Sequence, residues 1–182
     1  SRFLPFSNPR CGTRVNLKTQ VLQYSRLIQV NPAFFDDPQG YYLIWERCCR
    51  NNVISNINAP EATGQTFYME FPPMTINGQS INNNSPVFDL ISSDYPCINI
   101  PFQLPFGATD SNGDSLVYSL TNPIKGNSTP ARPRGTPPFP APYDPVSWKF
   151  GYSALNPLNG LPGLKVNPKT GLLTCTATQT GL

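Results

Sequence analysis

Proline is the residue type that most limits how this chain can fold. The 182-residue sequence contains 22 prolines. Proline breaks helices, and sheets tolerate it only at edges, ends and bulges. No segment longer than about ten residues has convincing helical periodicity. The sequence therefore predicts an all-β protein of short strands joined by long loops, with a proline-rich loop over residues 123–145.

Several segments carry strand patterns. Residues 41–47 (YYLIWER) are apolar on both faces, so we expect a central strand that is covered on both sides. Residues 66–71 are a second strand, and residues 116–120 alternate apolar and polar side chains as a half-buried strand does. Residues 98–106 are extended and contain prolines, which favours an edge strand. Residues 164–177 predict a β-hairpin.

The composition excludes several function classes. At 38% apolar residues the chain can bury a core, and a net charge of +3 from scattered Lys and Arg argues against nucleic-acid binding. The absence of histidine removes the commonest general base and transition-metal ligand. The adjacent carboxylates Asp36 and Asp37 share one turn and cannot oppose each other across a substrate. We expect no enzymatic activity, and no apolar run could span a membrane.

Five cysteines indicate an oxidising compartment. Cys11, Cys48, Cys49, Cys97 and Cys175 match no zinc-binding spacing, so disulfides are the favoured interpretation. Neighbouring residues of a strand point to opposite faces. We therefore expect Cys48 and Cys49 to bond to different partners, Cys11 and Cys97, in either order.

An acidic turn is the candidate metal site. Asp110, Asn112 and Asp114 place oxygen-bearing side chains at alternate positions around an Asn-Gly turn. Calcium takes six to eight oxygen ligands, so this turn is a candidate calcium site with further ligands from elsewhere. The alternative is an ordinary Asn-Gly turn with solubilising acidic neighbours. An EF-hand is excluded, because Ser115 and Thr121 occupy the positions of its glycine and glutamate.

Several motifs resemble a known class of surface protein. ATDSNGDSLVYSL (108–120) and GLKVNPKTGLLTCTATQTG (163–181) resemble cadherin-like and immunoglobulin-like repeats of large bacterial surface proteins. GYYLIWERCCRNNVISNI (40–57) and PVSWKFGYSALNPL (145–158) resemble the N-terminal region of Bacteroidetes proteins exported by the type IX secretion system. Several members are associated with gliding motility or PKD domains.

The resemblance implies secretion to the bacterial cell surface and two tandem immunoglobulin-like β-sandwich domains. The first would span residues 1–92 and hold the disulfides. The second, cadherin-like domain would span residues 93–182 and lack its final strand. Family members usually carry a small residue at position 175, so Cys175 is the candidate free or intermolecular thiol. Ser115, in Asp-Ser-Leu, resembles a site of O-glycosylation.

Three functions agree with these observations. The first is a non-enzymatic adhesin or structural fibre component, as a fragment of a larger secreted protein. The second is a filament subunit that assembles by strand donation. The third is a carbohydrate-binding module of a secreted hydrolase. The expected partners are other surface-protein domains, copies of this chain and surface glycans. Six aromatic residues could form a sugar-binding platform: Tyr41, Tyr42, Trp45, Phe67, Tyr68 and Trp148. Packing in the core is the favoured role for these side chains.

Overall fold

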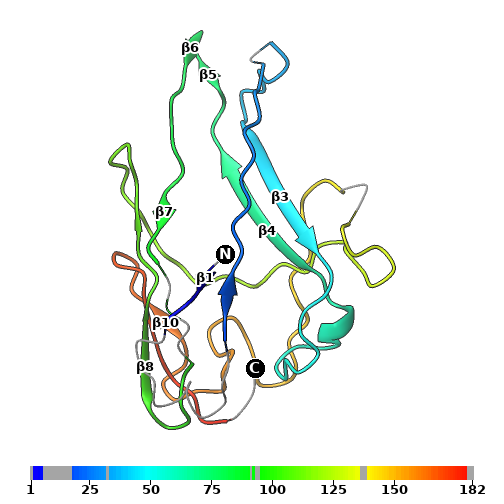
Figure 1. Cartoon of the computed structure of the whole chain (residues 1–182), viewed down its shortest axis with the longest axis vertical. Coiled ribbons are helices and arrows are strands. Elements are labelled where there is room, and N and C mark those ends of the chain that lie inside the picture. The colour runs from blue at the N-terminus through cyan, green and yellow to red at the C-terminus, as the bar shows by residue number, and fades with distance from the viewer. Residues whose placement is uncertain are drawn as a thin grey trace. The chain divides into compact units, whose positions relative to one another are not determined.

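The computed structural model of the chain consists mostly of β-structure in small antiparallel sheets (Figure 1). It describes residues 2–5, 18–31, 33–90, 92, 95–135 and 139–179. Over these residues there is no α-helix, and the short 3-10 helix η2 (Pro60–Ala62) is the one helical element. The structure thus confirms the prediction of an all-β chain. The largest sheet in this part of the chain has three strands.

The chain forms two compact units, each assembled from segments that are distant in sequence. Unit 1 comprises residues 1–25, 84–121 and 150–181. Unit 2 comprises residues 26–83, 122–149 and 182. A boundary between residues 92 and 93 stays a prediction from the sequence.

Unit 1 contains a three-stranded antiparallel sheet in the order β10 (Lys165–Val166), β11 (Leu172–Thr176) and β8 (Pro101–Pro105). Its outer strand β8 begins and ends with proline and, among the residues that the structure describes, pairs on one side only, as predicted. Two two-stranded ladders complete the unit: β1 (Arg2–Phe3) with β2 (Gln20–Val21), and β7 (Val87–Phe88) with β9 (Ala108–Thr109).

The predicted hairpin over residues 164–177 is present as β10 and β11. Its turn is fixed by Asn167, whose Oδ1 accepts hydrogen bonds from the N–H groups of Lys169 (2.9 Å) and Thr170 (3.1 Å). Asparagine commonly closes turns through such bonds to the backbone two or three residues on. Hydrogen bonds within the turn therefore set the register in which β10 and β11 pair.

The predicted strand at residues 116–120 does not form, although its alternation is real. Leu116, Tyr118 and Leu120 are half-buried, whereas Val117 and Ser119 are exposed. Tyr118 N–H donates to Pro168 O (3.0 Å) and Tyr118 OH accepts from Ala108 N–H (2.9 Å). The segment is thus anchored through its central tyrosine rather than through a continuous ladder. The strand prediction was wrong because the alternation of apolar and polar residues indicates which side chains are buried, but not whether the backbone forms hydrogen bonds with a neighbouring strand.

Unit 2 is centred on the long strands β3 (Tyr41–Arg47) and β4 (Gln65–Phe71), which pair antiparallel along their full lengths (Figure 1). A smaller hairpin joins β5 (Thr75–Ile76) and β6 (Gln79–Ser80). Residues 122–149 return to this unit. There, Ile124 bridges Thr66 and Pro145, and Trp148 bridges Ile57. The proline-rich segment therefore packs on β4 rather than projecting from the unit as a free loop.

The described residues bury few large side chains. No large side chain among them is fully buried. The buried apolar residues are small or medium in size, namely Cys48, Ile57, Val146, Cys175 and Ala177. The apolar core of the described residues is therefore small, and many large apolar side chains remain accessible to solvent.

Candidate functional site on the β3–β4 ladder

The β3–β4 ladder gathers the densest set of aromatic side chains. Aromatic and β-branched residues favour extended backbone, and successive side chains point to opposite faces. The register pairs Tyr41 with Phe71, Leu43 with Met69, and Trp45 with Phe67 on one face, the "open face", which ends in the polar pair of Arg47 and Gln65. The opposite "covered face" carries the alternate residues: Tyr42, Ile44, Glu46, Thr66, Tyr68 and Glu70.

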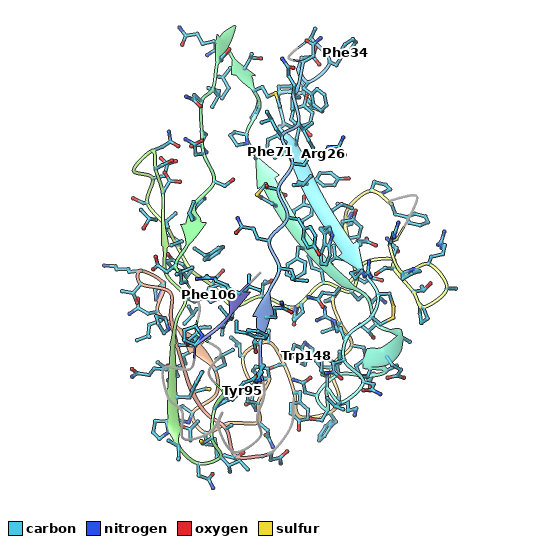
Figure 2. All side chains as sticks on the ribbon, in the orientation of Figure 1. Arg26, Phe34, Phe71, Tyr95, Phe106 and Trp148 are labelled. Atoms are coloured by element: carbon cyan, nitrogen blue, oxygen red, sulfur yellow. A yellow bond between two sulfur atoms is a disulfide. The ribbon has the colours of Figure 1, made fainter. Side chains whose placement is uncertain are left out.

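The three apolar pairs of the open face are accessible to solvent; Figure 2 labels Phe71, at the end of β4. The side chains of Leu43 (57%), Trp45 (58%) and Phe67 (54%) are more than half exposed. Ring centroids lie 5.5 Å apart for Trp45 and Phe67, and 5.7 Å apart for Tyr41 and Phe71. Cross-strand pairing thus fixes the rings side by side in a ladder of aromatic pairs.

Two predictions about this ladder were wrong. We expected β3 to be central and covered on both sides, but within the described residues it pairs with β4 alone and its open face is uncovered. We also expected its aromatic residues to pack in a core, but Tyr42, Trp45, Phe67 and Tyr68 are exposed. Trp148 lies apart from them and donates its indole N–H to Asn122 Oδ1 (2.9 Å).

The covered face meets the proline-rich segment. Glu46, 9% exposed, lies beneath this segment, and Asn127 N–H donates to its two carboxylate oxygens at 3.4 and 3.3 Å. The hydroxyl groups of Thr66 and Ser128 are also buried and have no hydrogen-bond partner among the described residues. Buried polar atoms of this kind are usually satisfied by internal water.

The cysteines pair differently from the expected pattern. Cys48 and Cys49 form a disulfide with each other. The alternation of side chains along a strand predicted different partners for Cys48 and Cys49. However, β3 ends at Arg47, so the two cysteines lie beyond the strand and the alternation does not apply to them. Cys97 is disulfide-bonded as well, and Cys11 lies outside the described residues.

Cys175 on β11 is a free, buried cysteine. Burial raises the pKa of its thiol, which keeps the sulfur protonated and weakly reactive at neutral pH. A bond to another copy through this sulfur would therefore require β11 to open.

The acidic turn is held together by its own side chains. Asp110 Oδ1 accepts hydrogen bonds from Asn112 N–H (2.8 Å) and Asp114 N–H (3.2 Å). Asn112 Oδ1 accepts from Asn84 N–H (2.8 Å) and Asn84 Nδ2 (3.1 Å). Ser115 follows in an exposed position. Asp110 Oδ1 and Asn112 Oδ1 are thus engaged with N–H donors, and the described residues contain no cluster of three Asp, Glu, Cys or His. These contacts favour the alternative, an ordinary Asn-Gly turn with acidic neighbours, over a preformed calcium site.

We therefore expect calcium to leave thermal stability unchanged. Adding 2 mM CaCl₂ to the EDTA-treated chain should shift the melting temperature by less than about 1 °C, since a ligand stabilises only by its affinity for the folded state. Differential scanning fluorimetry measures this directly. A larger shift that disappears in the Asp110→Asn/Asp114→Asn variant would restore the calcium prediction.

Sequence reasoning missed the polar residues around the ladder. Glu70 accepts a hydrogen bond from Tyr68 OH (2.7 Å), and Tyr42 OH accepts one from Ala141 N–H (3.2 Å). Tyr143 packs edge-on against Tyr68 at 6.4 Å between centroids. These residues come from segments that no local pattern connects, so only tertiary structure brings them together.

Comparison of the chain with known protein families, curated proteins and solved structures gave no match. The part of the chain that the structure describes contains no helix of the length and hydrophobicity that a membrane crossing needs.

Proposed function

We propose that this chain is a non-enzymatic module of a secreted bacterial surface protein, a structural fibre component or adhesin, and that it self-associates through its open face. The observation that carries the proposal is the accessible apolar ladder of Leu43, Trp45 and Phe67 with their cross-strand neighbours. Contiguous exposed apolar surface of this kind marks interaction sites. The motif resemblance supports the compartment and a pair of immunoglobulin-like domains.

A second copy of the chain is the partner that the surface fits best. The one charged side chain of the ladder on this face, Arg47, stands at the end of β3, so the apolar pairs from Tyr41–Phe71 to Trp45–Phe67 carry no charge and two copies can meet over them despite a net charge of +3 each. Half-exposed aromatic residues offer roughly 100 Å² each, so two such faces would bury on the order of 1,000 Å² in a symmetric pair, near the lower limit for a specific interface.

Light scattering coupled to size-exclusion chromatography tests the proposal. Between 5 and 100 µM, the disulfide-intact chain should shift from monomer to dimer, and Trp45→Lys should raise the dimer dissociation constant at least tenfold because it would bury an unpaired charge. Phe150→Lys is the matched control, since Phe150 is a fully exposed aromatic residue in unit 1. A monomer throughout the range, or equal loss in both variants, would refute self-association through this face.

Strand donation would give a different result in the same experiment. The outer edge of β3 is unpaired within the described residues, and such an edge can template a strand from another chain. Assembly through that edge would produce open-ended oligomers rather than a dimer. Trp45→Lys would affect such assembly little, because the side chain at position 45 projects from the face of the sheet and leaves the backbone N–H and C=O groups of the edge accessible.

A further inference from the structure

A pocket of about 520 Å³ opens at the end of the ladder, where the turn at residues 36–40 leads into β3. Tyr42 and Tyr68 of the covered face and Tyr41 and Phe71 of the open face contribute its aromatic surface. Its polar side chains are those of Asp37, Gln39 and Glu70. Its volume is typical of small-molecule sites, and all of these residues belong to unit 2.

The two tyrosine rings form a fixed and accessible platform. Their centroids lie 5.3 Å apart with an interplanar angle of 28°. Each ring is held by its hydroxyl group, that of Tyr42 by Ala141 N–H and that of Tyr68 by Glu70. Exposures of 42% and 36% leave ring surface open to a ligand. The hydrogen bond to Glu70 raises the pKa of Tyr68, so its hydroxyl stays neutral.

The polar rim is rich in acceptors. One oxygen of Glu70 is occupied by Tyr68, and Asp37 Oδ1 accepts from Gln39 N–H (2.9 Å), so each carboxylate keeps a second oxygen for a ligand. None of the described residues that line the pocket is a lysine or arginine. An anionic ligand is therefore disfavoured, and a suitable ligand must supply hydrogen-bond donors around an apolar surface.

We propose that this pocket binds a neutral saccharide of one or two pyranose rings. The C–H face of a pyranose packs on electron-rich aromatic rings, and its hydroxyl groups donate to carboxylates and to the glutamine amide. A cationic side chain would also supply donors, but it favours an enclosed aromatic cage, whereas these rings lie open beside solvated carboxylates. Tyr42 and Tyr68 lie on the covered face, whereas Tyr41 and Phe71 of the open face also line the pocket, so the sugar site borders the self-association surface but does not include Trp45.

Saturation-transfer NMR and calorimetry with defined probes test this site. We expect at least one of cellobiose, lactose, mannobiose or chitobiose to bind with a dissociation constant on the order of 1 mM, and sialyllactose and arginine amide to bind at least tenfold more weakly. Tyr68→Ala and Glu70→Ala should each weaken binding at least tenfold. The matched control Tyr24→Ala, which removes an exposed tyrosine of unit 1, should bind as the original chain does.

Each other outcome overturns the proposal. Failure of every neutral sugar to bind the folded chain removes the site, and preferential binding of arginine amide makes it a site for cationic side chains. Equal weakening in Tyr24→Ala shows nonspecific adsorption. Trp45→Lys separates this proposal from the preceding one: it should weaken dimerisation at least tenfold and preserve sugar binding, because Trp45 does not line the pocket.

Discussion

Gly135→Ala is expected to lower the free energy of unfolding of unit 2 by about 3 kcal/mol. Gly135 has φ +57°, and a Cβ there would lie 2.1 Å from Glu46 Oε2. The backbone conformation alone costs an L-residue roughly 1–2 kcal/mol. The rest arises because Glu46, 9% exposed and bonded to Asn127 N–H, cannot move into solvent.

A double-mutant cycle tests the steric part. Glu46→Ala removes the atoms that the new methyl group would meet, so Gly135→Ala should cost at least 1 kcal/mol less in the Glu46→Ala background. Both tryptophans of the chain, Trp45 and Trp148, lie in unit 2, so denaturation followed by tryptophan fluorescence reports on this unit.

Gly78→Ala is the control within the same unit. Gly78 has φ +75°, yet a Cβ there meets nothing within 4 Å, so this substitution should show only the conformational cost of about 1 kcal/mol. Equal losses for Gly78→Ala and Gly135→Ala would show that Glu46 does not support the proline-rich segment.

The elements that local chemistry determines were the ones the sequence could predict. The aromatic strand at residues 41–47, its neighbour at 65–71 and the Asn167 turn have the expected type and nearly the expected bounds. Pro101 and Pro105 correctly indicated a sheet edge, because proline cannot donate to a second neighbouring strand. In each case the deciding interactions lie within a few residues.

Long-range arrangement was where prediction failed. Apolar residues on both faces of β3 implied two covering layers, but the one covering segment comes from around Ile124, about eighty positions away, and the open face has none among the described residues. Alternation cannot distinguish a core from an interaction surface, since both require apolar side chains on one face. The polar residues of the sugar pocket were missed for the same reason, as Asp37 and Glu70 approach only through tertiary pairing.

Arg50 should be the second residue with a large effect on stability. Its guanidinium donates to Gly64 O from Nε (3.1 Å) and to Ile124 O from Nη2 (3.0 Å), thereby joining the end of the β3 region to the segment that covers β4. Burial lowers the pKa of Arg50, but arginine remains charged at neutral pH. Hydrogen bonds to charged groups contribute roughly 1.5–3 kcal/mol each.

Arg50→Met should therefore destabilise unit 2 by about 3 kcal/mol in the same denaturation assay. Methionine retains most of the apolar stem but removes the donor to Gly64 O and leaves Ile124 O with Thr66 N–H alone. Arg50→Lys should recover less than half of the loss, because one ammonium group cannot reproduce the geometry of a fork that contacts two carbonyls.

Arg47→Met is the matched control for charge. Arg47 ends β3 in an exposed position, so its replacement removes the same charge and should change stability by less than about 0.5 kcal/mol. If Arg47→Met and Arg50→Met cost the same, net charge rather than the two carbonyl contacts would explain the effect. If Arg50→Lys has the same free energy of unfolding as the original chain, a positive charge at that position is sufficient and the two-pronged guanidinium contact is not required. A large loss for Arg50→Met with poor recovery by lysine would establish that a single half-buried guanidinium joins the covering segment to the ladder.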